Sequence, residues 1–505
     1  MTASIFPTVT NNEFSAHLRK LLTPESTTPN DDESGSEPPC SSDEDLSPSG
    51  TKRRSEYELL RPQEINSRDS AVERHDHLTA PLLTSEAHEA VGLTANGSQY
   101  GLLGQILSIH NKGQSVVPED NRLYINTNAP LSALVCGVQG SGKSHTVACM
   151  LESMFIEDDD RIGTLSKSLS GLVLHMSDGG STSNPNETAW VGLPKDLASK
   201  APHVVIYVSP SSLRTMTNVY AHLGPNVKVK PLYFTEDELD AQAFLSMMAV
   251  GGADGAPLYI QIILSILREL GENYSYRAFQ EMLNEKRRTF NPAQAVGLEQ
   301  RMALLESFMS KGRMREKQSR RFRAGQLTIV DLSDPFIDPA SACGIFEIIV
   351  RLFVRVKVDT GKVLVVDEAH KYLAAKNGST GLTQALLTLI REQRHKGMRV
   401  IISTQEPTVV PPVLIDLCSV AVMHRFSSPS WYEHIIKHVS ADLSSSDAFD
   451  RIVKLQTGEA VVLAPSGLFM SGSNEDEAEQ FGRRYLIVRT RRRITRDGGS
   501  SIMVI

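Results

Sequence analysis

The stretch Gly137-Val-Gln-Gly-Ser-Gly-Lys-Ser144 decides the fold of this 505-residue chain. It fits the Walker A pattern G-x-x-x-x-G-K-[ST] at every fixed position. The apolar run LSALVCGV leads into it, and HTVACMLESMF, which has a helical pattern, follows it. This is the strand–loop–helix context that the pattern requires, and a fortuitous glycine-rich turn is the alternative. The sequence therefore predicts a phosphate-binding loop at this point of the chain.

Each residue type of the loop suits this chemistry. The glycines let backbone N–H groups converge on phosphate oxygens at a helix N-terminus. Lys143 neutralises charge on the β- and γ-phosphates, and the Ser144 hydroxyl ligates Mg²⁺. We expect ATP as the substrate and Mg²⁺ as the cofactor. The predicted ATP-binding residues are Gly137, Val138, Gln139, Gly140, Ser141, Gly142, Lys143, Ser144 and His145.

A second motif, VLVVDEAH, spans Val363 to His370. Its four apolar residues place Asp367 at the C-terminal end of a buried strand, where open α/β sheets bind their ligands. This is the Walker B pattern: Asp367 is the predicted metal ligand, through water, and Glu368 is the predicted residue that orients or deprotonates the attacking water. Two adjacent carboxylates that cap the next helix are the alternative.

The letters Asp-Glu-Ala-His also suggest a superfamily-two helicase, but spacing argues against it. Gly137 and Asp367 are 230 residues apart, and only about 135 residues follow His370. That is too few for a second RecA-like domain, and no Q-x-x-G-R motif occurs. His370 is therefore interpreted as a packing or surface residue.

A third element follows Walker B. The helical pattern LTQALLTLIREQRHKG leads into the strand-like run MRVIISTQEP, which closes with Ser403-Thr404-Gln405. This resembles the HerA/FtsK branch of P-loop ATPases, which includes type IV secretion ATPases. The resemblance implies that Gln405 senses the γ-phosphate and that Arg391 or Arg394 is an arginine finger acting in trans. A solvated helix face is the alternative for both arginines.

The resemblance covers roughly Leu131 to Pro465, and it implies an additional-strand, catalytic-glutamate ATPase working as an oligomer, a hexameric ring, with DNA as the transported polymer. Two departures limit it. Ser98 to Pro130 is too short for the β-barrel that precedes Walker A in HerA proteins, and Glu406 stands where those proteins usually have Arg. The segment HRFSSPSW from His424 is similar to segments of uncharacterised fungal ATPases.

Nine short Val/Ile/Leu runs alternate with helical segments, which predicts an α/β, RecA-like doubly wound, mainly parallel sheet. Between Glu236 and Ala324 the pattern is helical only. We therefore expect ATPase core over 98–235 and 325–470, a helical insertion over 236–324, and an acidic linker followed by a basic C-terminal strand and tail over 471–505.

Residues 1–97 are rich in Ser, Thr, Pro, Asp and Glu, which predicts a disordered N-terminal tail. This segment has 17 acidic and 8 basic residues, and hence a net charge of −9. Because the whole chain carries −7, the remainder is close to +2. The overall acidity therefore does not argue against a nucleic-acid partner, since local patches matter more than the total.

Five widely spaced cysteines indicate neither a disulfide framework nor a zinc site. No apolar run reaches the roughly 18 residues needed to cross a bilayer, and the first residues do not resemble a signal peptide. We therefore expect an intracellular protein of the nucleus or cytoplasm, without a membrane partner.

Two basic runs, 311–323 and 483–499, are the sequence features that could contact DNA. A solvated loop is the alternative for the first run, and a strand with one charged face is the alternative for the second. Two rivals to a DNA translocase therefore stay open. One is a nucleotide-dependent switch or scaffold, and the other is a protein-moving ATPase.

Overall fold

The computed structural model describes residues 78–91, 99–157, 159–180, 183–196, 200–247, 258–310, 321–373, 381–439, 441, 446–470 and 478–498. Most of the predicted tail, and residues 311–320 of the first basic run, lie outside these ranges.

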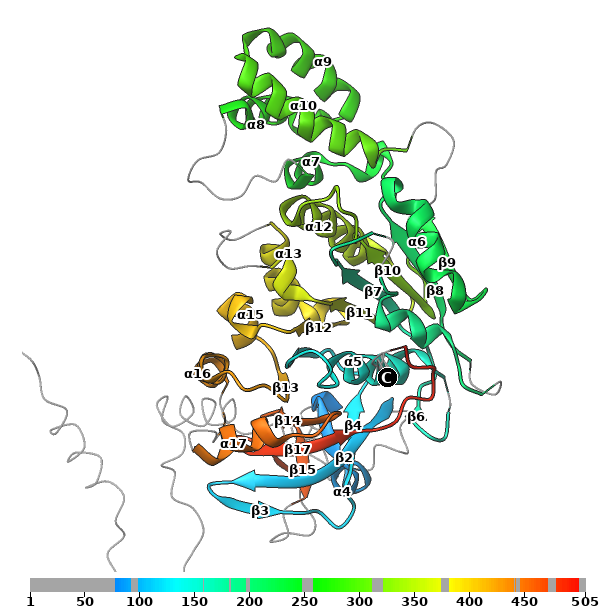
Figure 1. Ribbon diagram of the computed structural model, residues 1–505, viewed down its shortest axis with the longest axis vertical. Coiled ribbons are helices and arrows are strands. Elements are labelled where there is room, and N and C mark those ends of the chain that lie inside the picture. Colours follow the sequence, from blue (N-terminus) through cyan, green and yellow to red (C-terminus); the bar gives the residue numbers. More distant parts are fainter. Residues whose placement is uncertain are drawn as a thin grey trace, which may run out of the picture. The chain divides into compact units, whose positions relative to one another are not determined.

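Eight parallel strands form the central part of the sheet, in the order β9-β8-β10-β7-β11-β12-β5-β13 (Figure 1). Their residues are almost all buried, as continuous apolar runs predict for strands covered on both faces. The strands are β5 (Ser132–Cys136), β7 (Ser170–His175), β8 (His203–Val208), β9 (Val227–Pro231), β10 (Gln326–Asp331), β11 (Lys362–Val366), β12 (Met398–Thr404) and β13 (Val420–His424). The mainly parallel α/β sheet predicted from the sequence is confirmed.

Helices cover both faces of this sheet. Helices α5 (Lys143–Phe155) and α6 (Leu213–Tyr220) pack on the face that carries Val363 and Val365. Helices α12 (Pro339–Arg355) and α13 (Gly381–Arg391) pack on the face that carries Leu364 and Val366. The alternation of neighbouring β11 residues between the two cores follows from the two-residue period of a strand.

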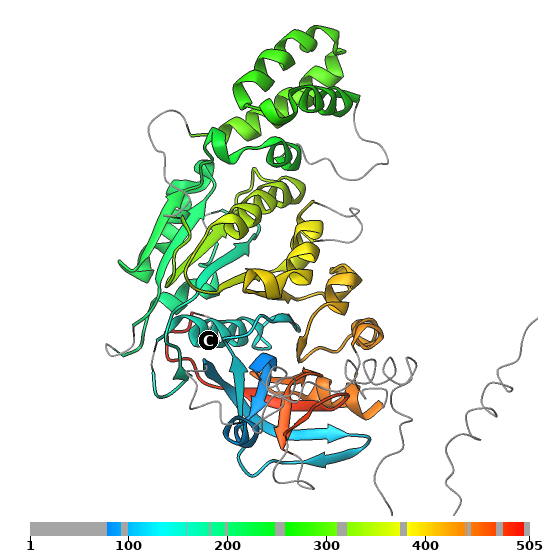
Figure 2. The same cartoon turned by 180° about the vertical axis from the view of Figure 1, so that it is seen from behind.

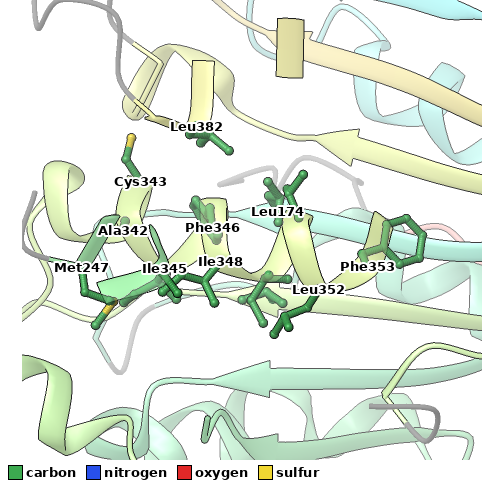
Figure 3. Packing of buried hydrophobic residues seen from close by; sticks show 14 of the residues in the cluster. Leu174, Met247, Ala342, Cys343, Ile345, Phe346, Ile348, Leu352, Phe353 and Leu382 are labelled. Carbon is green, nitrogen blue, oxygen red and sulfur yellow. The ribbon is translucent and has the colours of Figure 1, made fainter. Parts of the chain in front are cut away.

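Helix α12 shows how the local sequence sets an element. The Asp338 carboxylate accepts hydrogen bonds from the N–H groups of Ala340 and Ser341, and Pro339 occupies the first turn. In Figure 3 its apolar side chains, among them Ile345 and Phe346, pack with Leu174 of β7 and with residues of neighbouring helices. At its C-terminal end, the Lys362 ammonium donates to the carbonyls of Phe353, Val354 and Val356.

Antiparallel strands extend the sheet beyond β13, in the order β14-β17-β2-β4-β1. They come from both ends of the described chain: β1 (Leu82–Thr84), β2 (Tyr100–Asn111), β4 (Arg122–Asn126), β14 (Glu459–Leu463) and β17 (Tyr485–Thr490). Shorter strands β3 (Gln114–Val116), β6 (Gly163–Thr164), β15 (Leu468–Met470) and β16 (Ala478–Gln480) pair along this part. The predicted C-terminal strand is β17.

The predicted boundary at residue 97 needs correction. Strand β1 and helix α4 (Ser85–Ala90) precede it and belong to the fold. Leu82 and Leu83 are fully buried, and the Asn126 side chain donates to the carbonyls of Leu78 and Ala80. A three-residue apolar run that completes a sheet edge is too short to stand out from the acidic, Ser/Pro-rich composition around it.

Between β9 and β10 the named elements of the described residues are all helical: α7 (Ala241–Met247), α8 (Leu258–Leu270), α9 (Tyr276–Lys286) and α10 (Pro292–Ser307), with short 3-10 turns (Figure 2). Helix α10 begins at a capping box, in which Asn291 and Gln294 exchange side-chain-to-backbone hydrogen bonds. The ring of Phe244 in α7 lies 4.2 Å from that of Phe279 in α9. Arg301 in α10 donates to the Ser341 hydroxyl of α12 at 2.8 Å.

The remaining helices are α14 (Gln393–Lys396), α15 (Pro412–Asp416), α16 (Pro429–His438) and α17 (Ser446–Lys454). Within the described ranges, no helix is both long enough and apolar enough to span a bilayer.

Candidate functional site

The strand register brings the three sequence motifs to one edge of the sheet. Thr404 of β12 is the register partner of Cys136, directly before the Walker A loop. Ile402 of β12 is the partner of Val366, directly before Asp367. All three strands are parallel, so their carboxyl ends lie together. Strand β12 thus stands between the Walker A strand and the Walker B strand.

The Walker A loop has the backbone that its glycines predict. Gly137, Gly140 and Gly142 have φ angles of 148°, 73° and 112°, and helix α5 begins at Lys143. A side chain at Gly142 would place its Cβ 2.9 Å from the nitrogen of Gly458, so the position also lacks room. Gln139 and Gly140 are exposed at the tip of the loop.

Lys143 lies against its own loop. Its ammonium donates to the Val138 carbonyl at 2.9 Å, and the Ser141 hydroxyl donates to the same carbonyl at 2.7 Å. Burial lowers the pKa of Lys143, against the opposing effect of the nearby Glu368 and Asp367 carboxylates. The Lys143 ammonium shares this one neutral carbonyl with Ser141. Charged phosphate oxygens are stronger acceptors, so they can replace the carbonyl when a nucleotide binds.

His424 supports the loop from behind. Its Nε2 lies 3.0 Å from the Thr146 hydroxyl of α5, and its Nδ1 lies 2.9 Å from the Glu459 carbonyl oxygen. A Cβ on Gly137 would lie 2.8 Å from the His424 Cβ, so loop and imidazole are in tight contact. Because a carbonyl only accepts, Nδ1 carries the proton and Nε2 accepts from Thr146. Burial lowers the pKa of His424 to about 4.

This neutral histidine predicts a loss of stability in acid. The unfolded chain takes up a proton near the ordinary histidine pKa of 6.5, whereas the folded chain resists until about 4. The contribution of neutral His424 to the free energy of unfolding is therefore full above pH 6.5. It is lost as the pH falls towards 4, by up to about 3 kcal/mol. Thermal unfolding across this interval should show a steeper acid loss for the wild type than for His424→Asn, which keeps a donor and an acceptor but does not titrate. Equal losses would contradict the assignment.

Asp367 is buried at the end of β11 and is held by two donors. Its Oδ2 lies 3.2 Å from His175 Nδ1 and accepts the Asn186 amide at 2.8 Å. Burial would raise the pKa of Asp367, but the hydrogen bond and charge of His175 outweigh it and hold the pKa below its ordinary value. Burial likewise opposes protonation of His175, but Asp331 and Asp367 together raise its pKa. The Asp367 carboxylate is therefore ionised.

Glu368 has left-handed backbone angles, φ 51° and ψ 40°, which a non-glycine residue rarely adopts. Its carboxylate accepts from Gln405 Nε2, which lies 2.9 Å from each oxygen. His370 Nδ1 lies 3.4 Å from Glu368 Oε2 and accepts from the Gln405 backbone N–H, also at 3.4 Å. An Nδ1 that accepts carries no proton, and burial lowers the pKa of His370, so this contact is no ion pair.

The residues proposed to hold Mg²⁺ fit that ion in chemistry. The hydrogen bonds from His175 and Asn186 both end on Oδ2, and the nearby Ser403 hydroxyl also helps to lower the pKa of this carboxylate. Ser144, in the first turn of α5, supplies a half-exposed hydroxyl. A carboxylate oxygen and a hydroxyl, completed by phosphate oxygens and water, match the preference of Mg²⁺ for oxygen ligands.

His145 lies beside the loop and against the chain's C-terminal segment, residues 490–498. Its Nε2 lies 2.8 Å from the Arg491 carbonyl oxygen, and its Nδ1 lies 3.4 Å from Asp497 Oδ2. Residues of the same segment surround Glu152 of α5, which is fully buried. Glu152 accepts from the backbone N–H of Thr495 at 2.9 Å and pairs with the Arg491 guanidinium at 2.6 Å.

The predicted arginine fingers do not meet this loop. Arg391 ends α13, Arg394 lies in α14, and both are exposed. They precede Met398, the first residue of β12, whereas the Walker A loop lies beyond the last residue of the parallel strand β5. A seven-residue strand spans about 23 Å, so both arginines lie near the opposite edge of the sheet from their own Walker A loop.

The second basic run contains both buried and exposed arginines. Arg489 pairs with Glu459 at 2.7 Å, and Arg491 pairs with Glu152. Arg493 is buried, 3.8 Å from Glu152. From the first run, Arg321 is buried and pairs with Glu238 at 3.1 Å. Arg491 and Arg493 are therefore held by the buried Glu152 carboxylate, whereas Arg489 lies exposed on β17, which agrees with the predicted strand with one charged face.

Sequence reasoning missed three polar residues that support the site: His175, Asn186 and His424. His175 ends a buried strand, as Asp367 does, and that position was its available signal. The sequence singled out His424 only as the first residue of the segment HRFSSPSW. Asn186 lies in a loop, where no sequence pattern indicated it.

No protein-family model and no curated protein matches the chain. The solved structures that are similar to it include the following three. Genome packaging NTPase B204 from Sulfolobus turreted icosahedral virus 2, in complex with AMP, shares 12% identity over 70% of this chain and 98% of that one, with a TM-score of 0.29. VirB4 of Thermoanaerobacter pseudethanolicus shares 13% identity over 77% and 96%, with a TM-score of 0.40. The bacterial conjugative coupling protein TrwBdeltaN70 shares 11% identity over 72% and 91%, with a TM-score of 0.40.

At these identities and TM-scores, the assignment rests on the chain's own features. The Walker A strand, an additional strand and the Walker B strand lie in the order β5-β12-β11, and all three motifs meet at their carboxyl ends. The protein therefore has a RecA-like P-loop NTPase fold and resembles the HerA/FtsK type, as the motifs predict.

Proposed function

We propose that this protein binds and hydrolyses ATP as the motor subunit of an oligomer. The observation that carries the proposal is the meeting of Lys143, Asp367 and the Glu368–Gln405 pair at one sheet edge. Such a site contains a cation for phosphate, a metal-ligand carboxylate, a base for water and a polar γ-phosphate sensor. No other group of described residues that we find combines these four roles.

The reaction is in-line attack of water on the γ-phosphate. Glu368 accepts the proton of the attacking water, and Lys143 neutralises charge on the β- and γ-phosphate oxygens. Asp367 and Ser144 would hold Mg²⁺, which would neutralise charge that develops on the phosphates. The Gln405 amide hydrogen-bonds both oxygens of Glu368. When the substrate binds and this amide turns to the γ-phosphate, the Glu368 carboxylate becomes free to act as the base.

Assembly is part of the proposal because neither of the predicted fingers lies near the chain's own Walker A loop. Arg391 and Arg394 are exposed near the sheet edge opposite the Walker A loop. From there they suit the nucleotide of a neighbouring subunit, which supports a homo-oligomer, a hexameric ring by resemblance. One fixed cation in trans would make hydrolysis depend on assembly.

DNA is the proposed polymer by resemblance alone. Arg491 and Arg493 are engaged with the buried Glu152, so the sequence support for DNA contact rests on the exposed Arg483, Arg489, Arg492 and Arg496. The rival functions, a protein-moving ATPase and a nucleotide-dependent switch, are outcomes of the same assay.

The test is steady-state ATP hydrolysis by the full chain, alone and with single- or double-stranded DNA. Lys143→Ala should lower kcat/KM by about 10²-fold or more, since it removes a cation that stabilises developing charge. Lys167→Ala is the matched control, because Lys167 is an exposed lysine that pairs with Asp359 just before β7, near the opposite sheet edge.

Each outcome of this assay supports or contradicts one of the proposed functions. Stimulation by DNA that disappears in Lys143→Ala supports a translocase. Hydrolysis that ignores DNA removes the DNA proposal and leaves the protein motor or switch. Absence of both ATP binding and hydrolysis in the wild type would overturn the proposed function.

A further inference from the structure

A buried polar network lies directly behind Asp367. His175 and Asn186 are less than one-tenth exposed, and both contact the same carboxylate oxygen, Oδ2. His175 ends β7, the strand next to β11, while Asn186 precedes the 3-10 helix Glu187–Gly192. Neither residue belongs to a nucleotide-binding motif, and neither has a role in the reaction as described above.

The two donors settle the orientation of the carboxylate. An ionised carboxylate only accepts, so His175 Nδ1 and Asn186 Nδ2 both donate to Asp367. A carboxylate without such partners turns readily about its last bond, because that torsion is broad and two-fold. Two donors on one oxygen remove this freedom and leave Oδ1 as the oxygen available to a ligand.

Asn186 is itself fixed. Its side-chain oxygen accepts from the Thr188 backbone N–H at 3.0 Å, which directs the amide nitrogen towards Asp367. Its backbone N–H donates to the Tyr220 hydroxyl at 3.0 Å, and that hydroxyl donates to Asp331 at 2.6 Å. The asparagine thus cannot reverse its amide without breaking bonds on both sides.

His175 is fixed in a similar way by its strand. It is the register partner of Asp331, so it lies between the carboxylates of two neighbouring strands, β10 and β11. Successive hydrogen bonds thus join Asp367, Asn186, Tyr220 and Asp331, and His175 joins this group at Asp367. Hydrogen-bonded groups of this kind hold their members in place.

We infer that His175 and Asn186 are positioning residues, which fix Asp367 so that Oδ1 faces the Mg²⁺ of the bound nucleotide. The inference rests on the proposed function. Residues that orient a metal-ligating group in this way change metal affinity by about 10–100-fold when they are replaced. Neither residue belongs to the Walker A loop, so nucleotide affinity without metal should be unchanged.

The experiment is equilibrium binding of a fluorescent, non-hydrolysable ATP analogue to the full chain, with Mg²⁺ or with EDTA. The quantity compared is the gain in affinity that Mg²⁺ provides. In Asn186→Ala and His175→Ala this gain should fall by about 10-fold or more. His175→Asn should recover part of it, because the asparagine amide can replace the Nδ1 donor.

Asn226→Ala is the matched control. Asn226 donates its amide to the carbonyls of Gly192 and Pro202 at 2.8 and 2.9 Å, next to the start of β8. The Asn226→Ala change removes two partly buried hydrogen bonds far from Asp367. It should therefore lower the melting temperature without changing the Mg²⁺-dependent gain in affinity. A merely structural role of His175 and Asn186 would give the same pattern as this control.

The outcomes separate the inference from the function on which it rests. An unchanged Mg²⁺-dependent gain in folded Asn186→Ala, and in His175→Ala where it folds, overturns the inference. Absence of any such gain in the wild type overturns the proposed function instead. A reduced gain with unchanged affinity in EDTA supports both.

Discussion

Replacing Glu368 with glutamine is expected to lower kcat for ATP hydrolysis by about 10²–10⁴-fold, the range that general-base catalysis contributes. The substitution keeps the size of the side chain and its acceptor oxygen, so one contact with Gln405 Nε2 survives. It removes the negative charge that accepts the proton of water. Binding of ATP should persist, since Lys143 and the loop N–H groups are untouched.

The measurement is single-turnover hydrolysis together with nucleotide affinity. Glu406→Gln is the matched control, because Glu406 is an exposed carboxylate that directly follows Gln405. It should leave kcat within a few-fold of the wild type. A Glu368→Gln protein that hydrolyses ATP at the wild-type rate would show that another group accepts the proton.

Replacing Glu152 with glutamine is expected to destabilise the fold by about 3–5 kcal/mol, the cost of breaking a buried ion pair from one side. The Arg491 guanidinium is 8% exposed and the Arg493 guanidinium is 1% exposed, and both would lose their buried anion. The N–H and the hydroxyl of Thr495 both donate to the same Glu152 oxygen. With glutamine, both bonds persist only if the amide oxygen takes that place, and otherwise Thr495 loses at least one of them.

Urea unfolding of the full chain measures this loss. Glu187→Gln provides the comparison, since Glu187 is 29% exposed and lies 3.9 Å from Arg493, so its replacement should cost far less. Limited proteolysis should also cut residues 490–498 of Glu152→Gln more readily. A change below about 1 kcal/mol would mean that these arginines are held by packing and backbone contacts instead.

The sequence predicts the P-loop core well because its signals are local. The Walker A pattern and the apolar run before Asp367 each specify a short element and its end, and parallel strands then have to bring those ends together. Gln405 needed one further step, the resemblance, because a glutamine after a strand has many interpretations. Its two contacts with Glu368 confirm that it belongs to the same edge of the sheet as the Walker motifs.

The remainder depends on contacts between distant residues, which one sequence does not reveal. A run of arginines from 489 to 493 looks the same whether phosphates or buried carboxylates balance it, and Glu152 lies more than 300 residues away. Similarly, β1 gains its burial from β4 and β15, not from its own composition. Asn186 supports the site only because the fold brings its amide to Asp367 at the end of β11.

The pairing of β17 with β2 has a consequence for synthesis. Arg491 donates to the carbonyl of Leu102, 389 residues earlier in the chain, and the same segment encloses Glu152 of the Walker A helix. During translation, the ribosome must therefore release nearly all of the chain before α5 has its final environment. Since domains fold as their residues emerge, the nucleotide site matures last, although its loop is made early. The nucleotide site thus reaches its final structure only after β17 and residues 490–498 have been made.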